Sequence, residues 1–412
     1  MRFAVLAFLL AAPVVAQRPV AATARPEAPA TMEIDGQFLL KMKAHPAAAI
    51  VNTAKLDADK AMAVGPYSVM DKQDVPASGS KHDYASLAPY WWPNPDTKNG
   101  MPFVRKDGQV NPSRYKVPDD REFNETRNAV HALALGYYLT GNEKYARRAL
   151  LLLRRWFLNP ATRMNPNLKF AQAVPGVNTG RGTGLIEVRE IPRLLDAITL
   201  LSGSPAMTKA TKAGLRDWFT AYLKWLTTSK NGQEEADAKN NHGSWYDQQV
   251  VGIALFLGEK DLARQTAESA KTKRIAVQIE PDGSEPLELV RTKSFSYSVF
   301  SLDGLMRLAQ EADQVDVDLW DYRAPDGGSI RAALDYLVPF ATKKKEWTHE
   351  AINGVDGSLL VEPLLLGAMH WKDAEYLKLA EQLEKSPDLQ TRLLQAEAEE
   401  MLGGQGSGGA SH

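Results

Sequence analysis

Side chains suited to binding an anion are grouped in the stretch NNHGSWYDQQ, residues 240–249. Asn241 and His242 come directly before Gly243 and the apolar run VVGIALFLG, where a helix is predicted to begin. The free N–H groups and positive dipole end of a helix N-terminus favour an anion, and an amide and an imidazole beside them can bind a carboxylate. Tyr246 lies four residues after His242 and shares its face if the segment is helical. The alternative is an Asn that caps the helix and a His with a structural partner, but one Asn suffices for a cap, and the sequence favours a site.

A second reactive pair lies in the stretch EPDGSEPLELVRTKSFSYSVFSL, residues 280–302. Arg291 precedes Tyr297 by six residues, just before and within an apolar-periodic helix. An arginine close to a phenol lowers the pKa of the hydroxyl, so Tyr297 is a candidate general base. A surface arginine and a core tyrosine would produce the same pattern, which makes this signal weak by itself.

The stretch KHDYASLAPYWWPNPD, residues 81–96, carries three consecutive aromatic residues between prolines, Tyr90, Trp91 and Trp92. Three neighbours in a chain cannot all face one core, and the prolines disfavour regular structure. Exposed aromatic rings can stack on the apolar faces of sugars, while Lys81 and His82 can bind carboxylates. The alternative is a loop that packs its tryptophans into the core.

A glycine-rich stretch, NTGRGTGLIEVRE at residues 178–190, is a further candidate binding loop. Glycines allow the backbone to approach a ligand closely, and Arg181 supplies a rigid pair of donors for a carboxylate. The stretch matches a phosphate-binding loop poorly, since it lacks a preceding strand and a Lys-Ser/Thr pair. A flexible connection into a helix explains it equally well.

Helical hairpins must position these residues. Residues 128–158 contain two apolar-periodic segments separated at LTGN, and the same pattern returns with turns at Gly258 and near Trp371. Further helices are predicted at 187–201, at 208–228, and after residues 294 and 330. The sequence therefore predicts an all-α fold, an incomplete α/α toroid whose long loops form a cleft at one rim.

Composition and chain ends limit the function classes. The net charge of −1 over 412 residues gives nothing that would attract nucleic acid, so a polyanionic ligand requires a locally basic cleft. The chain has no cysteine, and its seven histidines form no metal-binding motif, so we expect no metal and no cofactor. Residues 1–16 are typical of a signal peptide, which predicts a periplasmic or secreted protein without membrane insertion once the signal is removed. We expect a linker at 17–35, one domain at 36–402 and a disordered tail at 403–412.

Taken together and in this order, HDYASLAPYWWPNPD, GRGTGLIEVRE, NNHGSWYD and DGSEPLELVRTKSFSYS resemble the alginate lyase superfamily. The similarity is greatest to polysaccharide lyase family 38 and to the related family 5, which are α/α-toroid enzymes. The resemblance implies β-elimination in a β-1,4-linked polyuronate, either mannuronate (alginate) or glucuronate (glucuronan), and hence an acidic polysaccharide as the partner.

The resemblance also implies a role for each matching residue. Asn241 and His242 would neutralise the C6 carboxylate, and Tyr297 would remove the C5 proton and return a proton to O4. Arg291 would hold the phenol in its reactive form. Many relatives have a His directly before this Tyr, whereas the residue here is Ser296. Tyr246 remains a rival base because of its helical spacing from His242.

Two other functions are compatible with a helical toroid. A glycoside hydrolase would need two carboxylates that flank the scissile bond, and Glu187, Glu190 and Glu350 are the candidates. A non-catalytic binder of oligouronates would use the aromatic loop and Arg181, but binding alone does not require the Asn-His, Arg and Tyr set.

Overall fold

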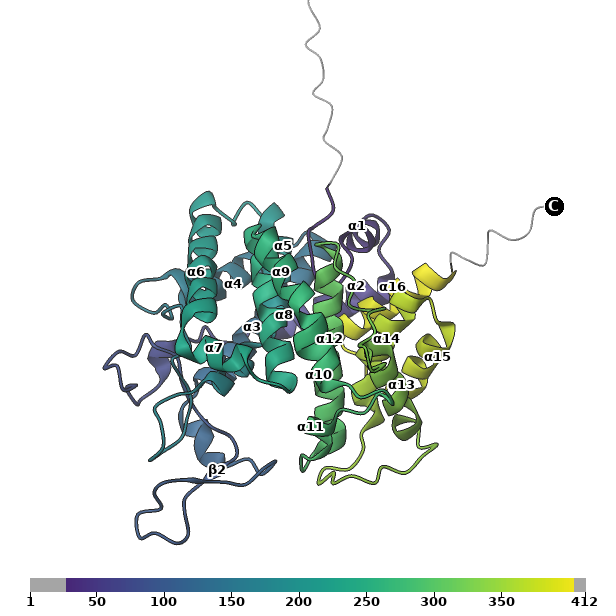
Figure 1. The fold of residues 1–412 in the computed structure, drawn as a ribbon. Coiled ribbons are helices and arrows are strands. Elements are labelled where there is room, and N and C mark those ends of the chain that lie inside the picture. The colour runs from purple at the N-terminus through teal and green to yellow at the C-terminus, as the bar shows by residue number, and fades with distance from the viewer. Residues whose placement is uncertain (1–26, 404–412) are drawn as a thin grey trace, which may run out of the picture.

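The structure is a computed structural model that describes residues 27–403 (Figure 1). The predicted signal peptide, residues 17–26 of the predicted linker and residues 404–412 of the predicted tail lie outside this range. Helices make up most of the described chain. The α-helices are α1 (Gly36–Ala44), α2 (Ala48–Ala61), α3 (Asp119–Thr140), α4 (Glu143–Leu153), α5 (Ile191–Leu200), α6 (Lys209–Thr228), α7 (Lys230–Ala236), α8 (Asn241–Leu257), α9 (Lys260–Ala270), α10 (Ala276–Gln278), α11 (Pro286–Leu289), α12 (Ser294–Asp313), α13 (Ile330–Ala341), α14 (Val361–Trp371), α15 (Ala374–Leu383) and α16 (Leu389–Gly403).

Short helical turns and strands complete the fold. The 3₁₀ turns are η1 (Val69–Asp71), η2 (Pro112–Lys116), η4 (Gly182–Val188), η5 (Leu201–Gly203) and η7 (Gly357–Leu360), and the π turns are η3 (Arg154–Leu158) and η6 (Lys271–Ile275). Strand β1 (Ala85–Leu87) pairs in parallel with β4 (Phe170–Ala173), and β2 (Trp91–Trp92) pairs antiparallel with β3 (Val104–Arg105).

The three predicted helical hairpins are confirmed. Helix α3 ends at Gly141 and α8 ends at Gly258, and both glycines have the positive φ of a left-handed helix end, 68° and 82°. Lys372 takes the same conformation after α14, with φ of 52°. These turns fold α4, α9 and α15 back against α3, α8 and α14.

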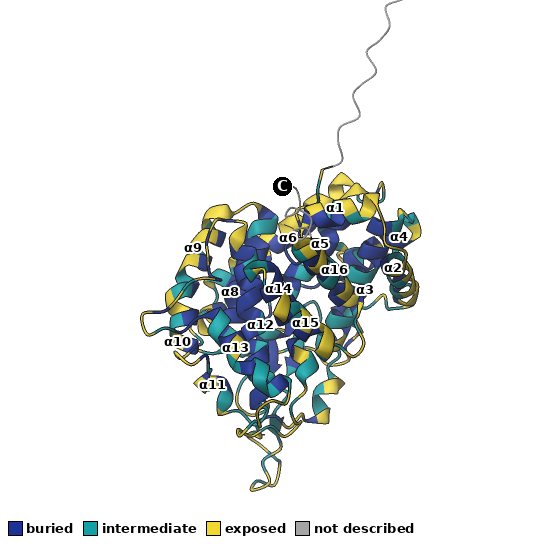
Figure 2. Ribbon diagram, turned by 90° about the vertical axis from the view of Figure 1, so that its right-hand side faces the viewer, coloured by how far each residue is buried: buried dark blue, intermediate teal, exposed yellow. Residues whose placement is uncertain are grey.

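Two layers of helices form the predicted α/α toroid. The largely buried helices α3, α5, α8, α12 and α14 contact one another in series, so each covers the apolar face of the next. Figure 2 shows buried positions along α8, α12 and α14 in the middle of the molecule and exposed positions on outer helices such as α9. The all-α prediction is confirmed, and the inner helices provide the rigid frame of the site.

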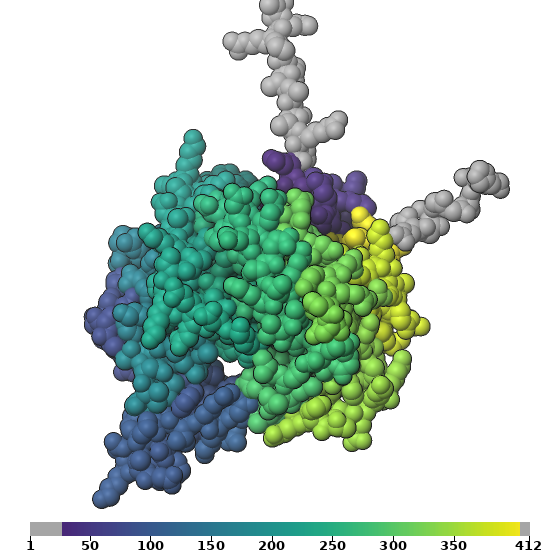
Figure 3. Space-filling model, viewed as in Figure 1, coloured from purple at the N-terminus to yellow at the C-terminus, as the bar shows by residue number. Residues whose placement is uncertain are grey.

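The loop that carries β2 and β3 projects from one rim of the toroid (Figure 1). Figure 3 shows an opening between this lobe, coloured blue, and the green segment around α11 and α12. The loop reaches that segment at Asp107, whose carboxylate binds the Arg291 guanidinium at 2.9 and 3.1 Å. The hollow under the loop is therefore bounded on both sides.

The linker prediction is wrong for residues 31–35. Met32 and Ile34 are buried in the core, and the backbone N–H groups of Met32 and Glu33 donate to the Asp196 carboxylate at 2.8 and 2.9 Å. The linker was predicted from the Ala- and Pro-rich composition of the preceding residues, although Met32, Glu33 and Ile34 are buried. This short segment is part of the domain.

None of the helices in residues 27–403 is both long and apolar enough to cross a membrane.

Candidate active site

A cleft of about 860 Å³ opens at the rim of the toroid beneath the projecting loop. Its walls come from distant parts of the sequence: the β2–β3 loop, η4 and α5, the α7–α8 connection, α12, and the start of α14. The four residues with predicted catalytic roles all line it, namely Asn241, His242, Arg291 and Tyr297.

Asn241 is the first residue of α8 and is almost fully buried. Its backbone N–H and its Nδ2 both donate to Glu288 Oε1, at 2.9 and 2.7 Å. Asn240 occupies the N-cap position, but its side chain makes no capping hydrogen bond. Capping therefore does not explain the two asparagines, and Glu288 fixes the orientation of the Asn241 amide.

His242 follows on the same turn and forms an ion-pair contact with Glu235, the Nδ1–Oε1 distance being 2.6 Å. A carboxylate only accepts hydrogen bonds, so Nδ1–H donates to it and Nε2 is the ring atom left for a ligand. Glu235 lies near the end of α7 and is buried. Glu235 precedes the histidine by seven residues, and it was not predicted as part of the site.

Tyr297 lies in the first turn of α12, and its hydroxyl is hydrogen-bonded to that of Tyr90, with an O–O distance of 2.8 Å. The Arg291 guanidinium lies over the Tyr297 ring, 3.7 Å from its centroid. Two residues predicted separately, one in the aromatic loop and one in α12, thus meet at a single point. A sugar bound there would contact both phenols.

The electrostatic effect of Arg291 differs from the prediction. Burial and the neighbouring Tyr90 raise the pKa of Tyr297 above its usual value, and the lowering contributed by Arg291 is smaller. The guanidinium faces the ring rather than the oxygen and also pairs with Asp107, whose own pKa is held below its usual range by Arg291 and Thr292 despite its partial burial. Arg291 alone does not keep Tyr297 ionised in the free protein.

Arg181 and Trp91 form another wall of the cleft. The Arg181 guanidinium lies 5.8 Å from the Trp91 ring centroid, and its Nη2 donates to Gln172 Oε1 at 2.7 Å. The cation and the aromatic ring hold each other in place. A flat ring beside a fixed guanidinium suits an acidic sugar.

Four predicted substrate-binding residues do not line the cleft. Trp92 alternates with Trp91 on β2 and points away, with its Nε1 donating to the Gln109 carbonyl at 2.9 Å. The buried Tyr246 contacts the Leu226 carbonyl through its hydroxyl at 3.3 Å, and burial raises its pKa. Although Tyr246 shares a helix with His242, its phenol is packed into the core, which removes it as a rival base.

Lys81 and His82 also lie outside the cleft. His82 Nδ1 is 2.7 Å from the Arg163 carbonyl, and the Lys81 carbonyl accepts from the buried Lys72. They precede β1, where the chain runs along the toroid before it reaches the projecting loop. Proximity to the aromatic residues in sequence was misleading here.

The carboxylates that a hydrolase would need are not paired across the cleft. Glu187 is buried and accepts from Tyr84 and Ser86 at 2.8 and 2.6 Å, while Glu350 is exposed and does not line the cleft. Glu190 does line it, but its Oε2 is 2.6 Å from Arg127. These three carboxylates therefore do not provide an acid and a base on either side of a glycosidic bond.

Several cleft residues were missed, among them Arg105, Arg189, Lys293, Ser296, Phe300 and Glu234. Helical spacing was the available signal for part of this set. Residues 296, 300, 303 and 307 recur every three or four positions on α12 and line the cleft beside Tyr297.

Comparison with known proteins identifies the family. The alginate lyase family model matches residues 68–347, more than half of the chain. The chain belongs to the alginate lyase family. It is therefore a polysaccharide lyase, and the four catalytic candidates fall inside the matched region.

Solved structures agree with this assignment. An alginate lyase from Bacteroides ovatus has 38% sequence identity and a TM-score of 0.85, over 89% of this chain and 99% of that one. Alginate lyase A1-III from Sphingomonas species A1 shares the fold at 16% identity with a TM-score of 0.56, over 87% of this chain and 98% of that one. A comparison with curated proteins gives no match.

Proposed function

We propose that this alginate lyase family member cleaves β-1,4-linked polyuronate by syn β-elimination, with polymannuronate as the first substrate and glucuronan as the alternative. One observation carries the proposal. The Tyr297 hydroxyl, the Asn241 amide and the His242 imidazole belong to a single cleft beside Arg291, which is the set that elimination from a uronate requires.

Asn241 and His242 neutralise the C6 carboxylate of the bound sugar. Removal of the C5 proton places additional negative charge on the C6 carboxylate. The proton therefore becomes acidic only when that charge is stabilised. His242 can do this as an imidazolium, with its Nδ1–H bound to Glu235 and its Nε2–H available to donate to the sugar carboxylate. The Glu288 contact fixes Asn241 in the same way.

Tyr297 then acts as both base and acid. Its phenolate removes the C5 proton, the C4–O4 bond breaks, and a C4–C5 double bond forms. The phenol returns the proton to O4, so protons balance within one residue. A single phenol reaches one face of the sugar, and H5 and O4 share that face in D-mannuronate and D-glucuronate but not in L-guluronate.

The relatives support alginate as the substrate to test first. The Bacteroides ovatus protein, at 38% identity, is named an alginate lyase. A single-residue variant of the Sphingomonas enzyme, similar in fold only at 16% identity and a TM-score of 0.54, is described in complex with a tetrasaccharide. Residues 1–16 lead us to propose that the enzyme acts in the periplasm or outside the cell.

An ultraviolet assay tests the proposal, because only a lyase creates a double bond conjugated with the carboxylate. The purified enzyme is incubated with polymannuronate, polyguluronate, glucuronan and hyaluronan. We expect absorbance to rise with polymannuronate or glucuronan and to change little with polyguluronate. New reducing ends without absorbance would indicate a hydrolase, and binding without cleavage would indicate a binding protein.

A further inference from the structure

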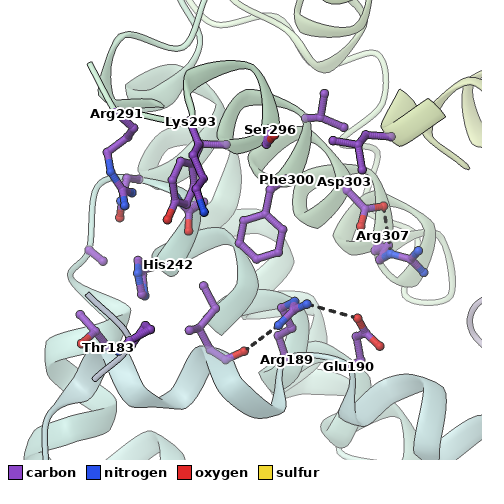
Figure 4. Close-up of a pocket in the computed structure, with 18 of the residues that line it drawn as sticks. Thr183, Arg189, Glu190, His242, Arg291, Lys293, Ser296, Phe300, Asp303 and Arg307 are labelled. Atoms are coloured by element: carbon purple, nitrogen blue, oxygen red, sulfur yellow. Dashed lines mark hydrogen bonds and ion pairs between the residues drawn. The ribbon is translucent and has the colours of Figure 1, made fainter. Parts of the chain in front are cut away.

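The cleft continues beyond Tyr297 along α12, past Phe300 to Asp303 and Arg307. Phe300 follows Tyr297 by three residues, which places it about 4.5 Å further along the helix axis on the same face. Figure 4 shows Phe300 and Arg189 facing each other, between His242 on one side and the Asp303–Arg307 pair on the other. A polymer that enters the site of Tyr297 must place a neighbouring sugar either here or at the opposite end.

Arg189 differs from the other arginines in this part of the cleft. The buried Arg193 and Arg307 are neutralised at short range, Arg193 by Glu33 at 2.7 Å and Arg307 by Glu33 and Asp303 at 3.1 and 3.0 Å. Arg189 contacts Glu190 at 3.4 Å and the Ile186 carbonyl at 3.3 Å.

Glu190 is shared between two arginines, because its Oε2 lies 2.6 Å from Arg127 while its Oε1 lies 3.4 Å from Arg189. The Arg189 Nε is buried and finds no hydrogen-bond partner among residues 27–403. Arg189 therefore retains donors for an additional anion and has its carboxylate partner only at 3.4 Å, whereas Arg193 and Arg307 each have a carboxylate at 3.1 Å or less.

The Arg189 guanidinium is held in place by aromatic rings. It lies 5.0 Å from the centroid of Phe300 and 5.7 Å from that of Trp245. These contacts fix its plane before a ligand arrives, which reduces the entropy lost on binding. The half-buried Phe300 offers an apolar surface beside it.

We propose that Arg189 and Phe300 form a second uronate-binding subsite next to the site of Tyr297, in which Arg189 binds the carboxylate and Phe300 contacts the ring of the adjacent sugar. The proposal rests on the proposed function, since a repeating uronate presents one carboxylate per sugar. The subsite binds and positions the substrate and takes no part in proton transfer.

The test compares oligomannuronates of increasing length, from disaccharide to hexasaccharide. In Arg189→Met the linear stem keeps its contacts with Phe300 and Trp245 while the charge is removed. We expect kcat/KM to fall about tenfold to a hundredfold on substrates long enough to fill the subsite, the loss for one charged hydrogen-bonded contact. The shortest cleaved substrate should be affected less than threefold.

Two variants serve as controls. Arg216→Met removes a guanidinium that lies 6.0 Å from the Phe256 ring centroid outside the cleft, and it should leave every length unaffected. Arg189→Lys keeps the charge but not the planar pair of donors, so its activity should lie between those of the wild type and Arg189→Met. If Arg189→Met lowers the melting temperature, Phe300→Leu provides the same length comparison.

The subsite proposal would be overturned if Arg189→Met lost the same factor in kcat/KM on every oligomannuronate. It would also be overturned if kcat/KM of the variant rose with substrate length as steeply as that of the wild type. Failure of the proposed function is a different result, because the wild type would then cleave no uronate of any length. In that event tetramannuronate binding by calorimetry still decides the subsite: equal affinity of wild type and Arg189→Met overturns it, and weaker binding by the variant supports it.

Discussion

At the scale of single residues, buried carboxylates orient the two groups that we propose meet the substrate. Glu235 holds His242 and Glu288 holds Asn241, so each of these two side chains is hydrogen-bonded to a buried acid. Such partners fix the rotamer and tautomer before substrate arrives. The arrangement makes His242 a suitable test of carboxylate neutralisation.

His242→Ala should lower kcat by about 10²- to 10³-fold, the effect of removing one donor to a developing oxyanion. The fold should survive, since the side chain lines the cleft. Steady-state kinetics with a melting curve checks this. His82→Ala is the matched control, because His82 lies outside the cleft and should leave turnover unchanged. Near-wild-type turnover of His242→Ala would remove the residue from the mechanism.

Asp107 offers a test of how the phenol is activated. Burial and Tyr90 raise the pKa of Tyr297, Arg291 lowers it, and the Asp107 charge raises it further. With the Tyr297 phenolate as the proposed base, kcat/KM should increase with pH toward the alkaline range. Asp107→Asn removes a negative charge near the phenol and so lowers the pKa of Tyr297. The rising limb of the kcat/KM profile should therefore move to lower pH. A rising limb that stays in place or moves to higher pH would contradict this role for Arg291 and Asp107.

At the scale of elements, strand β2 separates two adjacent tryptophans. Alternation along a strand turns Trp91 into the cleft and Trp92 away from it. Trp91→Ala should therefore raise KM severalfold with less effect on kcat, whereas Trp92→Ala should leave KM close to the wild-type value. Kinetics on polymannuronate distinguishes the two, and equal effects would mean that the loop binds substrate differently.

The segment before α1 is a second element with a measurable role. Glu33 is buried between Arg193 and Arg307, and these arginines lower its pKa although burial opposes them. Glu33→Gln should reduce the free energy of unfolding by about 3 kcal/mol, since it leaves buried charges without their partner. The exposed Glu27 provides a control in Glu27→Gln, which should change little.

The pH dependence of this effect has a defined sign. A carboxyl with a lowered folded pKa stabilises the protein above its unfolded pKa of about 4.3, and this contribution disappears as pH falls through the folded value. Denaturant unfolding of wild type and Glu33→Gln should therefore differ most near neutral pH and converge in acid. A constant difference across pH would exclude the charge as the cause.

The sequence predicted these elements better than it predicted side-chain directions. Apolar periodicity and glycine turns located the hairpins because they reflect local backbone preferences. Periodicity also placed Tyr246 on the face of His242, but packing against Leu226 took the phenol into the core. Glu235 and Arg189 were missed because their roles arise from contacts between separate helices, which no local pattern encodes.

At the scale of the whole molecule, a nearly neutral protein places seven arginine and lysine side chains in its cleft together with six carboxylates. The net charge is −1, yet Arg105, Arg181, Arg291 and Lys293 line the part of the cleft near Tyr297. The carboxylates of a polyanion would therefore be bound by these individual cations and not by a positive field over the whole surface. The inner helices hold these cations and the proposed base, Tyr297, in one place.

The most direct test of the central claim is the activity of Tyr297→Phe on polymannuronate, measured by ultraviolet absorbance and compared with Tyr246→Phe. We predict that Tyr297→Phe loses at least 10³-fold in kcat, a loss within the range expected for a missing general acid–base group, yet binds tetramannuronate about as tightly as the wild type in calorimetry. Tyr246→Phe should keep its turnover, since its hydroxyl faces the core. Appreciable turnover by Tyr297→Phe, or its loss in Tyr246→Phe with an intact fold, would contradict the account.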